Sequence, residues 1–192
     1  RRAGLHRLAE LEPAPPANRY EYAKPGQLLH LDIKKLGRFR KPGHRVTGER
    51  TITSDGIGWE YVHLAIDDHS RVAFGCIEPD ERGVSACRAL LLAVRYYRTL
   101  GVRFERVLTD NGACYRSRRF RRLVRRLGMR HLRTRPYTPR TNGKAERLVQ
   151  TCLREWAYAR SYNSSDCRAV AFKHWLHHYN WHRPHASLGH HA

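Results

Sequence analysis

Alternating apolar and polar residues in three consecutive segments constrain the fold of this chain more than any other feature. Residues 27–36 alternate so that His30 and Asp32 lie on the opposite face from a row of aliphatic residues. Residues 59–67 and 71–78 alternate in the same way, and a short polar stretch separates them. This pattern predicts three neighbouring strands that form an antiparallel meander.

The segments that follow switch between helical and strand patterns. Helical periodicity and a closing glycine predict a helix over 82–101, and an apolar strand at 104–110 comes directly after it. A strand that follows a helix commonly pairs in parallel with an earlier strand. The remaining expected elements are, in order, a helix at 116–128, a strand at 129–135, and helices at 142–158 and 167–179. The predicted fold class is α/β, with a mixed five-stranded sheet flanked by helices.

A proline-rich stretch precedes this pattern. Residues 11–26 contain four prolines and a glycine, so we expect residues 1–26 to be an N-terminal extension and linker. The folded core is expected at 27–180, followed by a C-terminal tail at 181–192. A length of 192 residues fits one domain with extensions. Because the first residue is Arg rather than Met, we expect the chain to be a fragment or a processed product.

The charge balance points to a polyanionic partner. The chain has 37 Lys and Arg residues against 17 Asp and Glu residues, a formal net charge of +20. Nucleic acid is the first candidate, because each phosphate that Lys or Arg neutralises releases counterions. A basic surface that binds nothing is the alternative. No apolar run reaches the ~18–20 residues of a membrane span, and the five scattered cysteines suggest reduced thiols in a cytosolic protein.

Three acidic residues in this basic chain form a candidate metal site. Asp32 lies in the first strand, Asp110 ends the fourth, and Glu146 opens the helix after the fifth, with 35 residues between the last two. Neighbouring parallel strands would place Asp32 beside Asp110. Crowded carboxylates repel one another unless cations lie between them, and hard oxygen ligands suit two Mg²⁺ or Mn²⁺ ions. Taken singly, each acid could instead be a water-facing strand residue, a turn former or a helix-dipole partner.

Residues beside these acids are candidate DNA contacts or turn formers. Asn142 lies on the same helix face as Glu146 and could contact DNA or cap the helix. Lys144 and Arg147 are candidate phosphate contacts. After Asp110, the Asn-Gly pair predicts a turn in which Gly112 takes a positive φ and lets the backbone approach closely. The acids of the "DDHS" stretch are also expected to form a turn.

Two further basic segments are candidate DNA contacts. The helix at 116–128 carries arginines without acids for ion pairing, so they repel each other and favour a phosphate partner over a merely solvated face. The arginines singled out there are Arg118, Arg122 and Arg125. Residues 37–58, rich in glycine and basic side chains, are expected to form a loop whose candidates are Arg38, Arg40 and Lys41.

Four motifs carry a resemblance that covers nearly the whole chain. "LLHLDIKKLGRF", "ERVLTDNGACYRS", "RTRPYTPRTNGKAERLVQTCLREWAY" and "HHYNWHRPHASLG" resemble the catalytic core of bacterial insertion-sequence transposases of the retroviral-integrase superfamily. The resemblance implies a ribonuclease H-like fold in which Asp32, Asp110 and Glu146 ligate the metal. It also implies hydrolysis at the ends of a double-stranded DNA transposon and attack of the freed 3′-OH on target DNA. An active complex of at least a dimer in the bacterial cytoplasm, at the nucleoid, is expected.

Two rival functions remain open from the residues alone. A ribonuclease H-like nuclease that hydrolyses DNA without joining it would use the same acids. A DNA-binding remnant without chemistry would keep the basic surface, although three intact carboxylates argue against it. Members of the resembling family usually carry a helix-turn-helix region upstream, so we expect the module that reads the DNA sequence to lie before residue 1.

Overall fold

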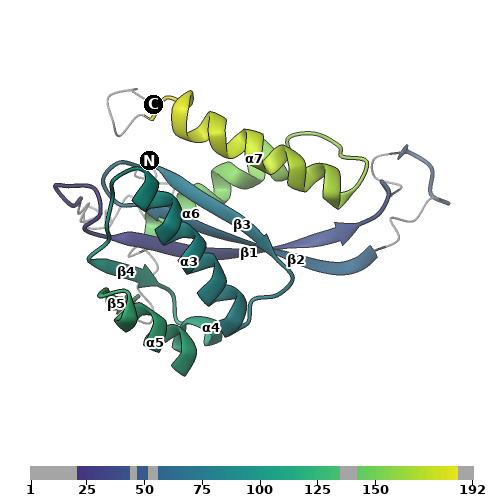
Figure 1. Ribbon diagram of the computed structural model, residues 1–192. Coiled ribbons are helices and arrows are strands. Elements are labelled where there is room, and N and C mark those ends of the chain that lie inside the picture. The colour runs from purple at the N-terminus through teal and green to yellow at the C-terminus, as the bar shows by residue number, and fades with distance from the viewer. Residues whose placement is uncertain (1–20, 44–46, 52–55, 135–141, 186–192) are drawn as a thin grey trace, which may run out of the picture.

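A single mixed sheet organises the molecule, as the sequence predicts (Figure 1). The computed structural model describes residues 21–43, 47–51, 56–134 and 142–185. The five strands lie in the order β3-β2-β1-β4-β5. Their bounds are Leu29–Phe39 for β1, Gly56–Asp67 for β2, Ala73–Glu78 for β3, Arg106–Thr109 for β4 and Arg130–Arg133 for β5. β1, β2 and β3 pair antiparallel, and β4 pairs in parallel with β1 and β5.

Helices cover both faces of this sheet. α3 (Gly83–Thr99), α4 (Ala113–Arg116) and α5 (Arg118–Arg126) contribute to one hydrophobic core. The second core contains α6 (Gly143–Cys152), the π-helix η2 (Leu153–Ala157) and α7 (Ser165–Trp181). Side chains of one strand serve both cores because successive residues point to opposite faces. Leu31 belongs to the first core and Leu36 to the second.

The structure differs from the expected elements at two places. The helix expected at 116–128 is interrupted at Ser117, whose extended backbone separates α4 from α5. Its hydroxyl oxygen accepts a hydrogen bond from Phe120 N at 3.2 Å, so Ser117 caps α5. The loop expected at 37–58 is also shorter, because β1 continues to Phe39 and pairs with the start of β2 at Gly56.

The end of the expected linker packs against the domain. Gly26 is buried with a φ of +86°, and a Cβ there would lie 2.3 Å from Arg103 O. Its N–H donates to Asp67 Oδ1 at 2.9 Å, and its carbonyl accepts from Glu105 N at 2.9 Å. Only glycine combines this backbone conformation with this close approach. The described chain before β1 is therefore fixed onto the sheet.

Aromatic packing holds α7 and η2 against the sheet. Phe172 of α7 lies with its ring centroid 4.4 Å from that of Trp156 and 5.8 Å from that of Trp175. Trp156 is 1% exposed and donates its Nε1–H to Arg168 O at 2.8 Å. Gly75 of β3 faces the same cluster: a Cβ there would meet Phe172 Cζ at 2.5 Å. The missing side chain at position 75 gives the phenylalanine its space.

We expect Gly75→Ala to lower the free energy of unfolding by about 1–3 kcal/mol, because the new methyl group overpacks a ring that cannot move away. Urea denaturation of the purified chain measures this. Gly37→Ala in β1 is the matched control, since a Cβ there has nothing within 4 Å, and it should change stability by less than about 0.5 kcal/mol. Equal effects of the two substitutions would contradict the packing argument.

Candidate active site

The register of the parallel β1–β4 pair places Asp32 beside Asp110. Leu29 pairs with Val107 and His30 with Leu108. The same register, continued by two residues, sets Asp32 opposite Asp110, immediately after β4 ends at Thr109. Two sequence-predicted ligands therefore meet where the short strand stops and β1 runs on.

Local backbone groups orient both aspartates. Asp32 Oδ1 accepts a hydrogen bond from Ile33 N at 2.8 Å, and Asp110 Oδ1 accepts one from Gly112 N at 2.9 Å. The positive φ expected at Gly112 is wrong, because its φ is −52°. The expected close approach is correct, since a Cβ at Gly112 would lie 3.0 Å from Asp110 Oδ1. The backbone thus holds one oxygen of each carboxylate.

Glu146 comes from the first turn of α6, which packs against β1 and β2. Ala145, Leu148 and Val149 bury one side of this helix in the second core, whereas Glu146 is exposed. Burial raises the pKa of Asp32 to about 6, and the negative charges of Asp110 and Glu146 add to this shift. Asp110 and Glu146 therefore both lie close enough to Asp32 to act on it electrostatically.

The donor set suits a hard divalent cation. Three carboxylates supply only oxygen ligands, and their mutual repulsion is relieved when a cation lies between them. Among the described residues, Glu146 forms no hydrogen bond or ion pair with protein. Also within this described part of the chain, no three acidic, histidine or cysteine side chains converge closely enough to complete a metal site. The chemistry of the residues fits Mg²⁺ or Mn²⁺.

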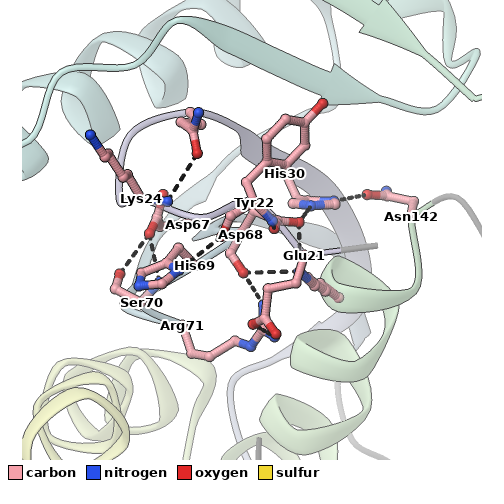
Figure 2. Close-up of polar contacts among 12 residues, drawn as sticks. Glu21, Tyr22, Lys24, His30, Asp67, Asp68, His69, Ser70, Arg71 and Asn142 are labelled. Atoms are coloured by element: carbon pink, nitrogen blue, oxygen red, sulfur yellow. Dashed lines mark hydrogen bonds and ion pairs between the residues drawn. The ribbon is translucent and has the colours of Figure 1, made fainter. Parts of the chain in front are cut away.

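A buried polar cluster connects α6 to β1 next to these carboxylates (Figure 2). We call it the Asp68 cluster; its members are Tyr22, His30, Asp68, Asn142 and Lys144. Asp68 is fully buried, and its Oδ1 lies 2.8 Å from His30 Nε2 and 2.7 Å from Lys144 Nζ. Tyr22 N donates to its Oδ2 at 2.8 Å. Burial favours a higher pKa, but the hydrogen bonds from His30, Lys144 and Tyr22 outweigh it and hold the pKa of Asp68 well below its usual range.

Asn142 completes this cluster on the side of β1. Figure 2 shows His30 between Asn142 and Asp68. Asn142 Oδ1 lies 3.1 Å from His30 Nδ1, and its Nδ2 donates to Leu31 O at 3.2 Å. The side chain makes no capping bond to α6, so the capping alternative raised from the sequence is wrong. Asn142 is 4% exposed and bound on both polar atoms, which places it inside the protein rather than on a DNA-facing surface.

Sequence reasoning missed this cluster. It correctly predicted a turn at "DDHS", but Asp67 and Asp68 are both fully buried. Asp67 Oδ2 accepts hydrogen bonds from Ser70 N and Ser70 Oγ, both at 2.8 Å, and so closes the turn itself. The available signal was His30, a titratable residue on a strand face two positions before Asp32.

Comparisons with known proteins agree with this architecture. A family model described as an integrase core domain matches residues 23–139, and a second model of the same description matches residues 127–192. The chain belongs to the integrase core domain family. The resemblance drawn from the sequence motifs is confirmed.

Relatives and solved structures give the same result. The putative transposase InsD for insertion element IS2E of Escherichia coli (strain K12) is 37% identical over 83 residues, which cover 43% of this chain and 38% of that protein. The transposase InsD for insertion element IS2D of the same strain is also 37% identical over 83 residues, covering 27% of its length. The match thus spans less than two fifths of these relatives.

The fold matches retroviral integrase cores. The catalytic core domain of BIV integrase aligns with a TM-score of 0.58 and 17% identity, covering 87% of this chain and 90% of that one. The HTLV-2 integrase catalytic core domain, solved in complex with magnesium, aligns with a TM-score of 0.55 and 14% identity, covering 84% of this chain and 87% of that one. The predicted ribonuclease H-like fold is confirmed. No described helix of this integrase core is long and apolar enough to cross a membrane.

The predicted basic residues lie in three separate regions of the integrase core. Lys144 and Arg147 line a hollow of about 660 Å³ together with Arg71, Arg154 and Arg183, and apart from His185 its charged lining is entirely cationic. Arg118, Arg122 and Arg125 are exposed on α5, against the opposite face of the sheet. Arg38 is exposed near the end of β1, with Arg40 and Lys41 exposed just beyond it.

We expect Asp32→Asn to stabilise the metal-free protein at pH 8 by up to about 3 kcal/mol, because a pKa raised from 3.8 to about 6 means that ionised Asp32 costs folding free energy. The folded-state pKa lies above the unfolded value, so this cost is absent below about pH 4 and grows as the pH rises through 6. Urea denaturation in chelator at pH 4, 6 and 8 measures the difference.

The control is Asp166→Asn, which removes an acid whose side chain is 88% exposed and should change stability by less than about 0.5 kcal/mol at each pH. A loss of stability in Asp32→Asn at pH 8 would contradict the electrostatic assignment.

Proposed function

We propose that this integrase core is the catalytic core of a DNA transposase. It hydrolyses a phosphodiester at each end of a transposon and transfers the freed 3′-OH to target DNA. The observation that carries the proposal is the β1–β4 register, which when continued sets Asp110 opposite Asp32, while Asp110 and Glu146 both act on Asp32 electrostatically. The transposases among the relatives support this reaction over others of the same fold.

Asp32, Asp110 and Glu146 are proposed to hold two Mg²⁺ or Mn²⁺ ions. Bound ions of this kind activate an attacking oxygen and stabilise a leaving one in phosphoryl transfer. Asp32 and Asp110 each accept a hydrogen bond on one oxygen from a nearby backbone N–H, of Ile33 and of Gly112, which orients the other oxygen without further reorganisation. Glu146 brings a third carboxylate from α6. The HTLV-2 integrase core solved with magnesium is consistent with this choice of metal.

Double-stranded DNA is the proposed substrate. Arg147 is exposed in the cationic hollow beside Lys144, one residue after the third ligand, and suits a phosphate close to the reacting bond. The α5 arginines and the exposed cations after β1 suit phosphates farther away. Because two transposon ends must be held together for joining, at least two copies are proposed to act in the complex.

We expect Asp32→Asn, Asp110→Asn and Glu146→Gln each to abolish cleavage of a candidate transposon end while DNA binding persists. Each change removes a metal ligand together with a charge that repels phosphate. Gel assays with supercoiled plasmid and labelled ends, in Mg²⁺ or Mn²⁺ and in excess chelator, measure nicking and joining separately.

Arg95→Ala on α3 serves as a control that removes an exposed charge away from the site. Cleavage that survives any of the three changes would contradict the assignment of Asp32, Asp110 and Glu146 as metal ligands. Nicking by the wild-type chain without any joined product, in assays where both ends and target are present, would favour a nuclease that does not join DNA.

The six arginines of α5 are expected to contribute to DNA binding. All are exposed, and none forms an ion pair with another described residue. Replacing Arg118, Arg122 and Arg125 by Ala should weaken binding to every duplex alike. It should also flatten the plot of log K against log salt by about 0.9 for each lost phosphate contact. Fluorescence anisotropy at several salt concentrations measures this slope.

The matched control replaces Arg95, Arg98 and Arg103 by Ala. These three are also exposed, so the net charge falls by the same amount. An equal change of slope in both triple variants would show that net charge, rather than contact by α5, governs binding.

A further inference from the structure

We propose that Asp68 is a positioning residue that fixes the first turn of α6 against β1, so that Glu146 faces Asp32 and Asp110. This inference rests on the proposed function for its catalytic meaning, but the placement of α6 can be tested without any reaction. Asp68 itself makes no described contact with the carboxylates of Asp32, Asp110 or Glu146. It acts through its hydrogen-bonded partners.

The partners of Asp68 are placed symmetrically in the sequence. His30 precedes Asp32 by two residues, and Lys144 precedes Glu146 by two residues. Both bind the same oxygen of Asp68, His30 Nε2 at 2.8 Å and Lys144 Nζ at 2.7 Å. A single buried carboxylate therefore joins the strand that carries one proposed ligand to the helix that carries another.

These contacts closely define the position of the first turn of α6. An α-helix has about 3.6 residues per turn, so Glu146 stands about one turn after Asn142 and about half a turn after Lys144. Asn142 is bonded to Leu31 O and lies against His30, while Lys144 also donates to the backbone carbonyl of residue 68 at 3.0 Å. Anchors at two positions of the same turn fix its height and its rotation. The direction of the Glu146 side chain follows from both.

The apolar core does not supply the same constraint on α6. Ala145, Leu148 and Val149 bury α6 in the second core, but apolar contacts are non-directional and tolerate small rotations. The hydrogen bonds to Asp68 are directional and charge-assisted, and Asp68 is fully buried, away from competing water. The core holds α6 on the sheet, and the Asp68 cluster fixes its orientation.

Asp67 provides a matched control. It is also fully buried and lies in the same turn. Its carboxylate accepts hydrogen bonds from Gly26 N at 2.9 Å and from Ser70 N and Oγ at 2.8 Å, and it forms no described bond with the side chains of β1 or α6. Asp67→Asn therefore reports the general cost of altering a buried acid in this turn. Asp68→Asn makes the same chemical change and, in addition, weakens the link to α6.

The first measurement is Mn²⁺ affinity of the purified chain without DNA, by titration calorimetry or electron paramagnetic resonance. Residues that orient metal ligands typically change metal affinity by about 10- to 100-fold when replaced. We expect a loss of that size in Asp68→Asn and none in Asp67→Asn, at temperatures where urea titration shows both variants fully folded. Equal losses in the two variants, or no loss in Asp68→Asn, would overturn the proposal.

The second measurement is amide hydrogen exchange, which needs neither metal nor DNA. We expect Asp68→Asn to accelerate exchange in residues 143–148 and Asp67→Asn to accelerate it only in the turn around residue 70. If Asp68→Asn leaves exchange in the first turn of α6 unchanged, the proposal fails, whatever the metal titration shows.

The third measurement distinguishes positioning from direct DNA contact by Lys144. In a double-mutant cycle with Lys144→Met, the losses of cleavage rate at saturating DNA should be less than additive, because both changes break the link between Asp68 and Lys144. Independent roles would give additive losses. If the wild-type chain binds Mn²⁺ but cleaves no transposon end, the proposed function fails, while the Mn²⁺ and exchange results still decide the role of Asp68.

Discussion

The short parallel pairing between β1 and β4 is the constraint on which the candidate site depends. A one-residue slip in this register would turn every side chain of β4 to the other face and would separate Asp110 from Asp32. Leu29 and Val107, which pair across the two strands, are both 0% exposed in the first core. Such complete burial penalises any slip, because it would move apolar side chains out of the core. A few buried aliphatic contacts therefore fix the relation between two acids that are far apart in the chain.

Much of the fold could be predicted from the sequence, because strand alternation and helical periodicity are local properties. The antiparallel meander and the parallel β4 were correct. The errors lie where tertiary contacts override local pattern. β1 runs on to Phe39 because β2 pairs with it beyond the alternating segment, and the long helix after Asn142 changes to π geometry at Leu153–Ala157. At Gly112 the sequence indicated a tight approach but could not show the sign of φ.

The candidate site divides in the same way. The acidic residues and their spacing are visible in the sequence, so Asp32, Asp110 and Glu146 could be named. The Asp68 cluster could not be predicted, because its contacts span 38 residues to His30 and 76 residues to Lys144. Knowing that α6 packs across β1 requires the fold itself. The turn signal at Asp68 was correct, but its burial depends on the segment around Tyr22, which was expected to be linker.

Because its oxygens are engaged in hydrogen bonds, Asp68 competes little with the proposed metal ligands for a cation. A carboxylate offers about four lone-pair directions, and His30, Lys144 and Tyr22 N together occupy three of those at Asp68. This acid, which binds residues two positions before Asp32 and Glu146, has little coordinating capacity left to divert an ion. Asp32 and Asp110 each commit only one oxygen to the backbone, and Glu146 commits none to the described protein. The carboxylate oxygens that remain free to bind a cation are therefore those of Asp32, Asp110 and Glu146. Asp68 has few such positions left.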